Sequence, residues 1–264
     1  MMMQATFDKG DVRVVAVIQA RMSSSRLPGK VLEDIGGKNS LGWMVTRVRR
    51  AELIDEVVIA TTTDPSDDPI VDYCRTNGIS YFRGSMPDVL DRVYQAARGF
   101  EADVVVRLTG DCPFIDPHLL DDNLRTFLTA EPPLDFAANR LPPPWKRTIP
   151  IGLDAEYCTF TGLETIWQQA TEKHQREHVM PYFYEHPESF NILHITHEPN
   201  CGHLRWTLDT AADLALLREI AAHFEGRDDF SWLDVLALVE QYPDLAEMNV
   251  QVDAKDYRET DSRV

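Results

Sequence analysis

The segment VVAVIQARMSSSRLPGKVL, residues 14–32, joins two stretches of opposite character. It begins with a short apolar run rich in β-branched residues, which predicts a buried strand that ends near Gln19. The eleven residues that follow carry Arg21, Arg26 and Lys30, three serines and a Pro-Gly pair. Because the whole chain has a formal net charge of −17, three cations in one loop indicate either an anion site or a basic loop in solvent.

The first half of the chain continues by alternating strands with helices. Further strands are predicted at 56–63 (EVVIATTT), 79–84 (ISYFRG) and 102–110 (ADVVVRLTG). Helices are predicted at 40–51, 67–78 and 88–99. Ser40 is the expected cap of the first helix, and Asp68 and Pro69 are the expected cap and first residue of the second. Short apolar strands separated by helices predict a doubly wound, mostly parallel α/β sheet over residues 12–130.

The second half is less regular. Residues 139–152 (NRLPPPWKRTIPIG) contain four prolines and predict a long loop or lid. Strands are predicted at 153–160, 190–197 and 203–209, and helices at 161–173, 210–224 and 231–242. Thr161 and Glu164 form the expected capping box of the first of these helices. We predict one domain, residues 12–248, with flexible tails at 1–11 and 249–264.

Composition excludes several classes of protein. A pI near 4.8 argues against a nucleic-acid-binding scaffold, which would present a basic face. The four cysteines show no CxxC spacing, which argues against a zinc cluster or a disulfide framework. No apolar stretch approaches the length of a membrane span, and the segment MMMQATFDKGD lacks the apolar core of a signal peptide. We therefore expect a cytoplasmic protein without membrane or nucleic-acid partners.

The loop after the first strand is the expected ligand site, because ligands of open α/β sheets bind at the carboxyl ends of the strands. Gly29 permits close approach of the backbone, and the three cations can neutralise phosphate oxygens. The loop matches neither the P-loop pattern nor G-x-G-x-x-G. Asp111 follows the predicted strand 102–110 and is expected to face the same crevice.

Several segments together resemble the cytidylyltransferase-like family of polysaccharide biosynthesis (the SpsF type), which is related to the CMP-Kdo and CMP-sialic acid synthetases. They are IQARMSSSRLPGKVL, VVIATTTDPSDDPI, FRGSMPDVLDRVYQAA, ADVVVRLTGDCPFIDP, GLDAEY, QREHVMPYF and LRWTLDTAADL, in the family's order over roughly residues 13–225. The resemblance implies a GT-A-like nucleotidyltransferase fold with a nucleotide-binding half, 12–130, and an acceptor and dimerisation half, 131–248. The dimer surface would lie on a smaller inserted or C-terminal lobe.

The same resemblance implies the reaction and its residues. CMP would pass from CTP to a hydroxyl of a sugar, sugar acid or related small acceptor, with release of pyrophosphate, in a homodimeric enzyme. The implied catalytic residues are Arg21, Lys30, Asp111 and Asp209. The implied nucleotide-binding residues are Gln19, Ala20, Arg21, Lys30, Thr61, Thr62 and Thr109.

The resemblance assigns a metal to two carboxylates. Asp111 and Asp209 would hold Mg²⁺, or Mn²⁺, which usually needs only one or two protein carboxylates beside phosphates and water. Asp209 has a structural alternative, because it precedes Thr210 at the start of a predicted helix and could be part of its cap.

The acceptor site is the least defined part of this assignment. The implied contacts are Asp91, Arg92, Asn139, Asp154, Glu156, Arg176 and His178. Asp91 and Arg92 have a second interpretation as a surface pair on a helix. The segment HQREH (174–178) also matches the H-x-x-E-H zinc pattern, although nothing else indicates a peptidase. Lys146 and Arg147 either meet an acidic acceptor or face solvent.

One departure from the family leaves the identity of the acceptor open. The chain reads PIGLD where family members often read DGLD, so that Ile151 replaces an acid.

Two rival functions stay open at this stage. A GT-A glycosyltransferase would use a nucleotide sugar, but no D-x-D motif ends a central strand. A non-catalytic nucleotide-binding module is the other alternative, although Arg21, Lys30 and Asp111 together argue against a degenerate site.

Overall fold

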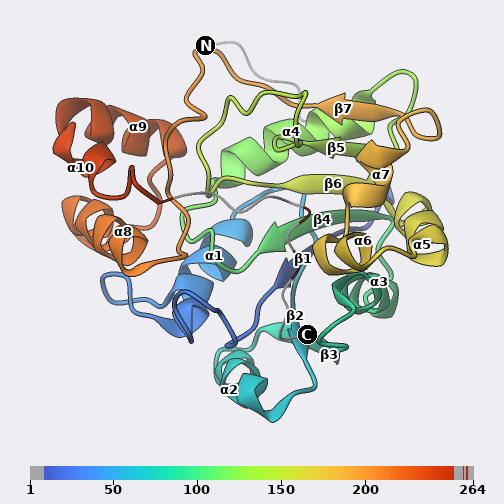
Figure 1. Cartoon of the computed structure of the whole chain (residues 1–264), viewed down its shortest axis with the longest axis horizontal. Helices are drawn as coiled ribbons and strands as arrows, with labels where there is room; N and C mark the ends of the chain where they lie inside the picture. The colour runs from blue at the N-terminus through green and yellow to red at the C-terminus, as the bar shows by residue number, and fades with distance from the viewer. Residues whose placement is uncertain (1–8, 253–257, 259, 261–264) are drawn as a thin grey trace.

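The strand predicted first, β1, lies inside a seven-stranded sheet of strand order β3-β2-β1-β4-β6-β5-β7 (Figure 1). The computed structural model describes residues 9–252, 258 and 260. Its strands are β1 (Val14–Gln19), β2 (Glu56–Thr62), β3 (Ser80–Gly84), β4 (Val104–Thr109), β5 (Phe136–Ala138), β6 (Glu156–Thr159) and β7 (Ile192–His194). β1 pairs in parallel with β2 and β4, and β2 with β3, which confirms the predicted mostly parallel sheet.

Helices cover both faces of the sheet. The α-helices are α1 (Ser40–Val48), α2 (Asp68–Thr76), α3 (Val89–Gly99), α4 (Pro117–Thr129), α5 (Phe160–Gln169), α6 (Lys173–His178), α7 (Pro181–Glu185), α8 (Ala211–His223), α9 (Trp232–Gln241) and α10 (Asp244–Glu247). Alternate residues of each central strand point to opposite faces. Val14, Ala16 and Ile18 pack with α1, α2 and α4, while Val15 and Val17 pack with α3 and α5.

A third apolar cluster lies beside the sheet and is formed largely by α8, α9 and α10, which group at one side of the molecule in Figure 1. Trp43 from α1 and Phe114 anchor this group, with their ring centroids 5.4 Å apart in an edge-to-face contact. Helices α8 to α10 are therefore packed against the first half of the chain, residues 12–130.

β6 is antiparallel to both of its neighbours, β4 and β5. Its first residue, Glu156, is paired with Arg107 of β4. The amino end of β6 therefore lies at the edge of the sheet where the parallel strands have their carboxyl ends. This reversal brings the segment before β6 to the expected ligand site.

Several predicted boundaries are wrong. Residues 203–209 form no strand, and only Arg205 makes an isolated bridge, with Ile151. α5 is not capped by Thr161 and Glu164, because β6 runs directly into it and the Thr159 hydroxyl accepts from the Gly162 amide. β5, three residues long, was not predicted.

Two other helix caps also differ from expectation. Asn39, not Ser40, caps α1, while the Ser40 hydroxyl donates to the Gly110 carbonyl. Asp67, not Asp68, occupies the N-cap position of α2, and its carboxylate bonds elsewhere.

The expected tails lie mostly outside the described residues. Asn249, at the start of the second tail, is buried, and its side chain donates to the Arg205 carbonyl at 3.0 Å. Among the helices of the described part, none is long and apolar enough to span a membrane.

Candidate active site

The loop after β1 is shaped by a buried aspartate that was not among the predicted site residues. Asp67 accepts hydrogen bonds from the Met22 amide at 2.7 Å and the Thr62 amide at 3.3 Å. The loop closes at Gly29, whose amide donates to the Met22 carbonyl and whose φ of 75° lies in the left-handed region that favours glycine. The backbone of the cationic loop is therefore fixed at both ends.

Gly110 brings the end of β4 against the end of β1. A Cβ at this position would lie 3.0 Å from the Gln19 carbonyl oxygen and 3.1 Å from the Ala20 Cβ. The Gly110 amide instead donates to the Gln19 carbonyl at 2.8 Å. Asp111 is thereby held directly beside the first loop.

A pocket of about 240 Å³ lies between these two segments. Five of the predicted nucleotide-binding residues line it, namely Gln19, Ala20, Arg21, Lys30 and Thr109. Thr61 and Thr62 do not, because both are buried and the Thr62 hydroxyl donates to Asp67. Sequence reasoning missed the lining residues Ser24, Ser25, Met86, Val89 and Glu177.

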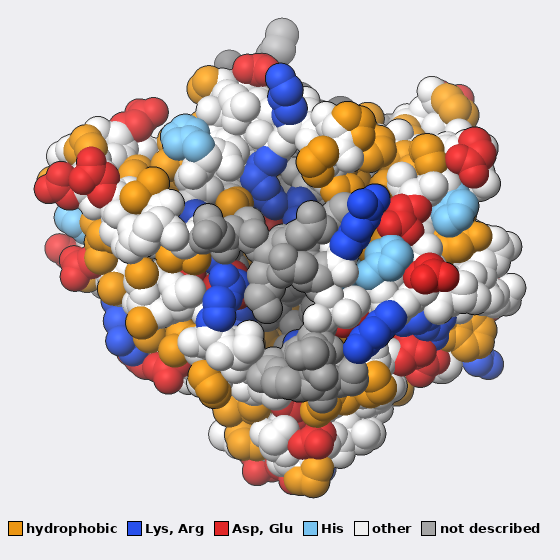
Figure 2. All heavy atoms as spheres, in the orientation of Figure 1, with side chains coloured by type: hydrophobic (Ala, Val, Ile, Leu, Met, Phe, Trp, Pro, Cys, Tyr) orange, Lys and Arg blue, Asp and Glu red, His pale blue; other side chains and the backbone are white. Residues whose placement is uncertain are grey.

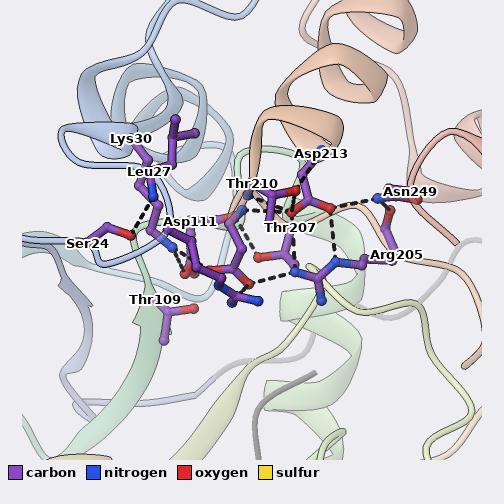
Figure 3. A network of polar contacts seen from close by, with 12 residues as sticks. Ser24, Leu27, Lys30, Thr109, Asp111, Arg205, Thr207, Thr210, Asp213 and Asn249 are labelled. Carbon is purple, nitrogen blue, oxygen red and sulfur yellow. Dashed lines mark hydrogen bonds and ion pairs between the residues drawn. The ribbon is translucent and has the colours of Figure 1, made fainter. Parts of the chain in front are cut away.

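Lys30 joins the two predicted metal carboxylates, and Figure 3 shows its ammonium beside Asp111. Its Nζ lies 2.6 Å from Asp111 Oδ2 and 2.7 Å from Asp209 Oδ1. Arg26 and Arg205 also contact Asp209 Oδ2, at 2.8 and 2.7 Å. Lys30, Asp111 and Asp209 come from three separate segments of the chain but form one cluster, in which the lysine is largely buried.

The attraction within this cluster outweighs the effect of burial. Burial alone would lower the pKa of Lys30, but Asp111 and Asp209 raise that pKa above its ordinary value. Burial alone would raise the pKa of Asp209, but Lys30 and Arg26 lower it to about 2. Lys30 and Asp209 are therefore both charged at neutral pH.

The Asp209 carboxylate does not cap α8, contrary to the structural alternative; only the Asp209 amide takes part, donating to Asp213 Oδ2 at 3.0 Å. Thr210 is the cap, and its hydroxyl accepts from the Asp213 amide while Asp213 returns the capping-box contact. The buried Asp213 carboxylate also accepts from Arg205 Nε at 2.9 Å and from Asn249 Nδ2 at 2.8 Å (Figure 3). This network fixes the arginine that in turn holds Asp209.

The two carboxylates suit a hard divalent cation. One oxygen of Asp111 and one of Asp209 converge on a single point, which the Lys30 ammonium now occupies. Oxygen ligands are those that Mg²⁺ prefers, and phosphates and water can complete its coordination. When bound there, such an ion would act as a Lewis acid on a phosphoryl oxygen.

A second pocket, of about 360 Å³, adjoins the first. The two pockets share Arg26, Thr109, Asp111, His178 and Asp209 as lining residues. Of the predicted acceptor contacts, Asp154, Glu156 and His178 line the second pocket, and Arg92 lines the first. The carboxylate cluster thus stands at the junction of the two pockets.

Three predicted acceptor contacts lie on the wall of neither pocket, because their polar groups are engaged inside the protein. Asn139 donates to the Leu153 carbonyl at 2.7 Å and is fully buried. The Asp91 carboxylate accepts from Trp167 Nε1 at 2.9 Å, so it is not a free surface charge. Arg176 donates to Asp88 at 3.0 Å.

The zinc interpretation of HQREH is wrong. The His174 ring contacts Glu185 at 2.7 Å, whereas His178 faces the pockets. Throughout the described ranges, no three or more His, Cys, Asp and Glu side chains are grouped so that they could hold a metal.

Arginine–carboxylate pairs line the second pocket and were mostly not predicted. Arg107 contacts Glu156 and donates to Gln19 Oε1 at 2.7 Å. Arg147, for which the sequence left two roles open, contacts Asp154. Figure 2 shows Lys and Arg side chains gathered around the middle of one face, although the chain is acidic overall.

Comparison with known proteins agrees with this geometry. The sequence model of the family described as cytidylyltransferase matches residues 15–250. The spore coat polysaccharide biosynthesis protein SpsF of Bacillus subtilis is 32% identical over 240 residues, which cover 88% of this chain and 96% of that protein.

Solved structures give the same result. A cytidylyltransferase from Leptospira borgpetersenii superposes with a TM-score of 0.84 at 32% identity, over 93% of this chain and 100% of that one. A CMP:2-keto-3-deoxy-manno-octonic acid synthetase in complex with CTP shares the fold, with a TM-score of 0.62 at 21% identity over 80% of this chain and 99% of that one. The family match over nearly the whole chain, together with the paired pockets, leads to one conclusion: this chain belongs to the cytidylyltransferase family.

Proposed function

We propose that this cytidylyltransferase transfers CMP from CTP to a hydroxyl of a sugar, sugar acid or related small acceptor and releases pyrophosphate. The observation that carries the proposal is the Lys30–Asp111–Asp209 cluster at the junction of two adjoining pockets. One pocket carries the cations of the first loop, and the other has room for a small acceptor.

The triphosphate would lie in the first pocket. That pocket is lined by Arg21, Arg26 and Lys30, which can neutralise the phosphate oxygens of the nucleotide. The acceptor hydroxyl would approach from the second pocket, across the shared wall at Thr109 and Asp111.

In the reaction, the acceptor oxygen forms a bond to the α-phosphorus, and the bond from that phosphorus to the bridging oxygen breaks. Pyrophosphate leaves with the electron pair, and the hydroxyl proton is released. The fixed cations favour this step because negative charge grows on the phosphate oxygens in the transition state.

The resident metal of the proposed enzyme is Mg²⁺, replaceable by Mn²⁺. Asp111 and Asp209 would hold it together with phosphate oxygens. Lys30 would then contact the triphosphate, which offers it a partner of the same charge as the carboxylates.

We also propose a homodimer that acts in the cytoplasm. β7 is the last strand in the sheet order, so within the described chain one of its edges has no strand partner. Tyr182 and Phe190 lie in the segment that precedes β7, and their aromatic side chains are only partly buried. The four cysteines are unpaired and buried, which suits a reducing compartment.

The test is a pyrophosphate-release assay of the four nucleotides against a panel of hydroxylated sugars and sugar acids. Pyrophosphate release that requires both CTP and an acceptor is expected. A nucleotide sugar consumed without pyrophosphate release would instead support a glycosyltransferase. Nucleotide binding without turnover of any acceptor would support the non-catalytic module.

A further inference from the structure

The second pocket contains one arginine more than its carboxylates can pair. Five arginines line it, together with four carboxylates. Four of the arginines form ion pairs: Arg26 and Arg205 with Asp209, Arg107 with Glu156, and Arg147 with Asp154. The fifth, Arg140, has an exposed side chain and makes no hydrogen bond or ion pair with any residue that the structure describes.

The backbone that carries Arg140 is held firmly. The preceding residue, Asn139, is buried at the end of β5. Its side chain donates to the Leu153 carbonyl at 2.7 Å and accepts from the Ala155 amide at 3.0 Å. The following residue, Leu141, is buried in the core. Arg140 therefore projects from a fixed position, which lowers the entropy lost when it binds a ligand.

The neighbouring charges do not neutralise Arg140. The carboxylates that act on it are Asp154 and Glu156, and each already contacts another arginine. Partial loss of water contact within the pocket opposes its charge, yet these carboxylates raise the pKa of Arg140. The side chain stays cationic, with its donors available to the pocket.

We propose that Arg140 binds an anionic group of the acceptor, a carboxylate or a phosphate, and thereby selects anionic acceptors over neutral ones. A guanidinium can donate to two oxygens of either group at once. The assignment rests on the proposed function only in naming the second pocket as the acceptor site. It also gives Asn139 a role, as a positioning residue for Arg140.

The experiment uses three probes that share a ring and differ at one carbon: glucose, glucuronate and glucose 6-phosphate. Their binding to the full chain and to Arg140→Met is measured by calorimetry or ligand-observed NMR. Glucuronate or glucose 6-phosphate should bind the unaltered chain at least about tenfold more tightly than glucose, and this preference should disappear in Arg140→Met. Comparison of the two anions shows which group the site accepts.

Two controls keep the result interpretable. Arg125→Met removes an exposed cation on α4 and should keep the preference. CTP affinity should be the same in Arg140→Met and the unaltered chain, because Arg140 does not line the nucleotide pocket. A preference that persists in Arg140→Met, or equal binding of all three probes to the unaltered chain, would overturn the assignment. Binding through Arg140 without pyrophosphate release in the nucleotide assay would overturn the proposed function alone.

Discussion

At the scale of single residues, Lys30 is the centre of the site. Its ammonium lies between carboxylates from two distant segments, Asp111 and Asp209. Two carboxylates this close repel each other, so keeping both ionised without a cation between them would cost free energy. The sequence indicated the cations of the first loop and Asp111 from their places after strands. It could not show that Lys30 meets Asp209, because no local pattern reports a contact between residues 179 positions apart.

The cations of the loop should govern nucleotide affinity. Arg21→Ala and Lys30→Ala should each weaken CTP binding by about 1.5–3 kcal/mol, because each removes a charge-assisted contact. Isothermal calorimetry measures the change. Arg75→Ala, which removes an exposed cation on α2, is the matched control. Unaltered CTP affinity in both loop variants would contradict the assignment of this pocket.

The two carboxylates should govern turnover more than affinity. Asp111→Asn and Asp209→Asn should each lower kcat on the order of 10²-fold or more, because charge on the phosphate grows mainly in the transition state. Chelation with EDTA should abolish activity, and Mg²⁺ or Mn²⁺ should restore it. Steady-state kinetics with Asp122→Asn, an exposed position on α4, provides the comparison. Full activity in excess EDTA would exclude a divalent metal.

At the scale of elements, α1 connects the sheet to the C-terminal helices. Arg47 of α1 is fully buried and donates to the carbonyls of Ile115, Asp228 and Phe230 at 2.7–2.8 Å. The helical pattern of α1 was readable from its apolar residues. The role of Arg47 was not, because a cation at that position usually indicates a solvent-facing side of a helix.

Arg47→Lys should therefore lower the free energy of unfolding by roughly 3 kcal/mol or more. The ammonium cannot reach three carbonyls that need donors at different angles, so buried acceptors are left unsatisfied. Urea denaturation measures the change. Arg49→Lys is the matched control, since Arg49 is exposed near the end of the same helix. Equal stability of the two variants would contradict this account.

The way the free energy of unfolding changes at acid pH should depend on Asp228. Burial would raise its pKa, but hydrogen bonds with Lys38 and Arg50 lower that pKa below its ordinary value. A carboxylate with a lowered folded-state pKa stabilises the fold above its unfolded pKa, about 3.9, and loses that contribution as the pH falls through the folded value. Asp228→Asn should thus be less stable than the unaltered chain at pH 7, and the difference should shrink below about pH 4. Chemical denaturation at a series of pH values measures this difference in stability. A difference that stays constant with pH would argue against a charged Asp228 as its cause.

At the scale of the whole molecule, strand polarity explains what the sequence could and could not predict. The alternation of strands and helices predicted the parallel strands β1 to β4 because each element has its own apolar pattern. The reversal of β6 depends on partners that are remote in sequence, and β5 is too short to give a pattern. The position of Arg140 in the second pocket could not be predicted either, because Arg140 follows the short strand β5 in a proline-rich loop.

The proposed homodimer is tested on the intact protein. Light scattering coupled to size-exclusion chromatography should give twice the mass of one chain, 30.1 kDa, because pairing would cover the open edge near β7. The measurement is repeated over a range of concentrations. The mass of a single chain at every concentration would count against the dimer.

The network that ends at Asn249 has a consequence for biosynthesis. Ribosomes make Lys30 first, Asp111 next, Asp209 much later and Asn249 later still. Asn249 holds Asp213, which fixes Arg205, which in turn holds Asp209. The cluster is therefore complete only when Asn249 has left the exit tunnel and packed. A nascent or prematurely terminated chain thus carries the cationic loop without its full set of counter-charges. Catalytic competence should therefore appear only after residue 249 has been made and packed, well after the cationic loop itself has been synthesised.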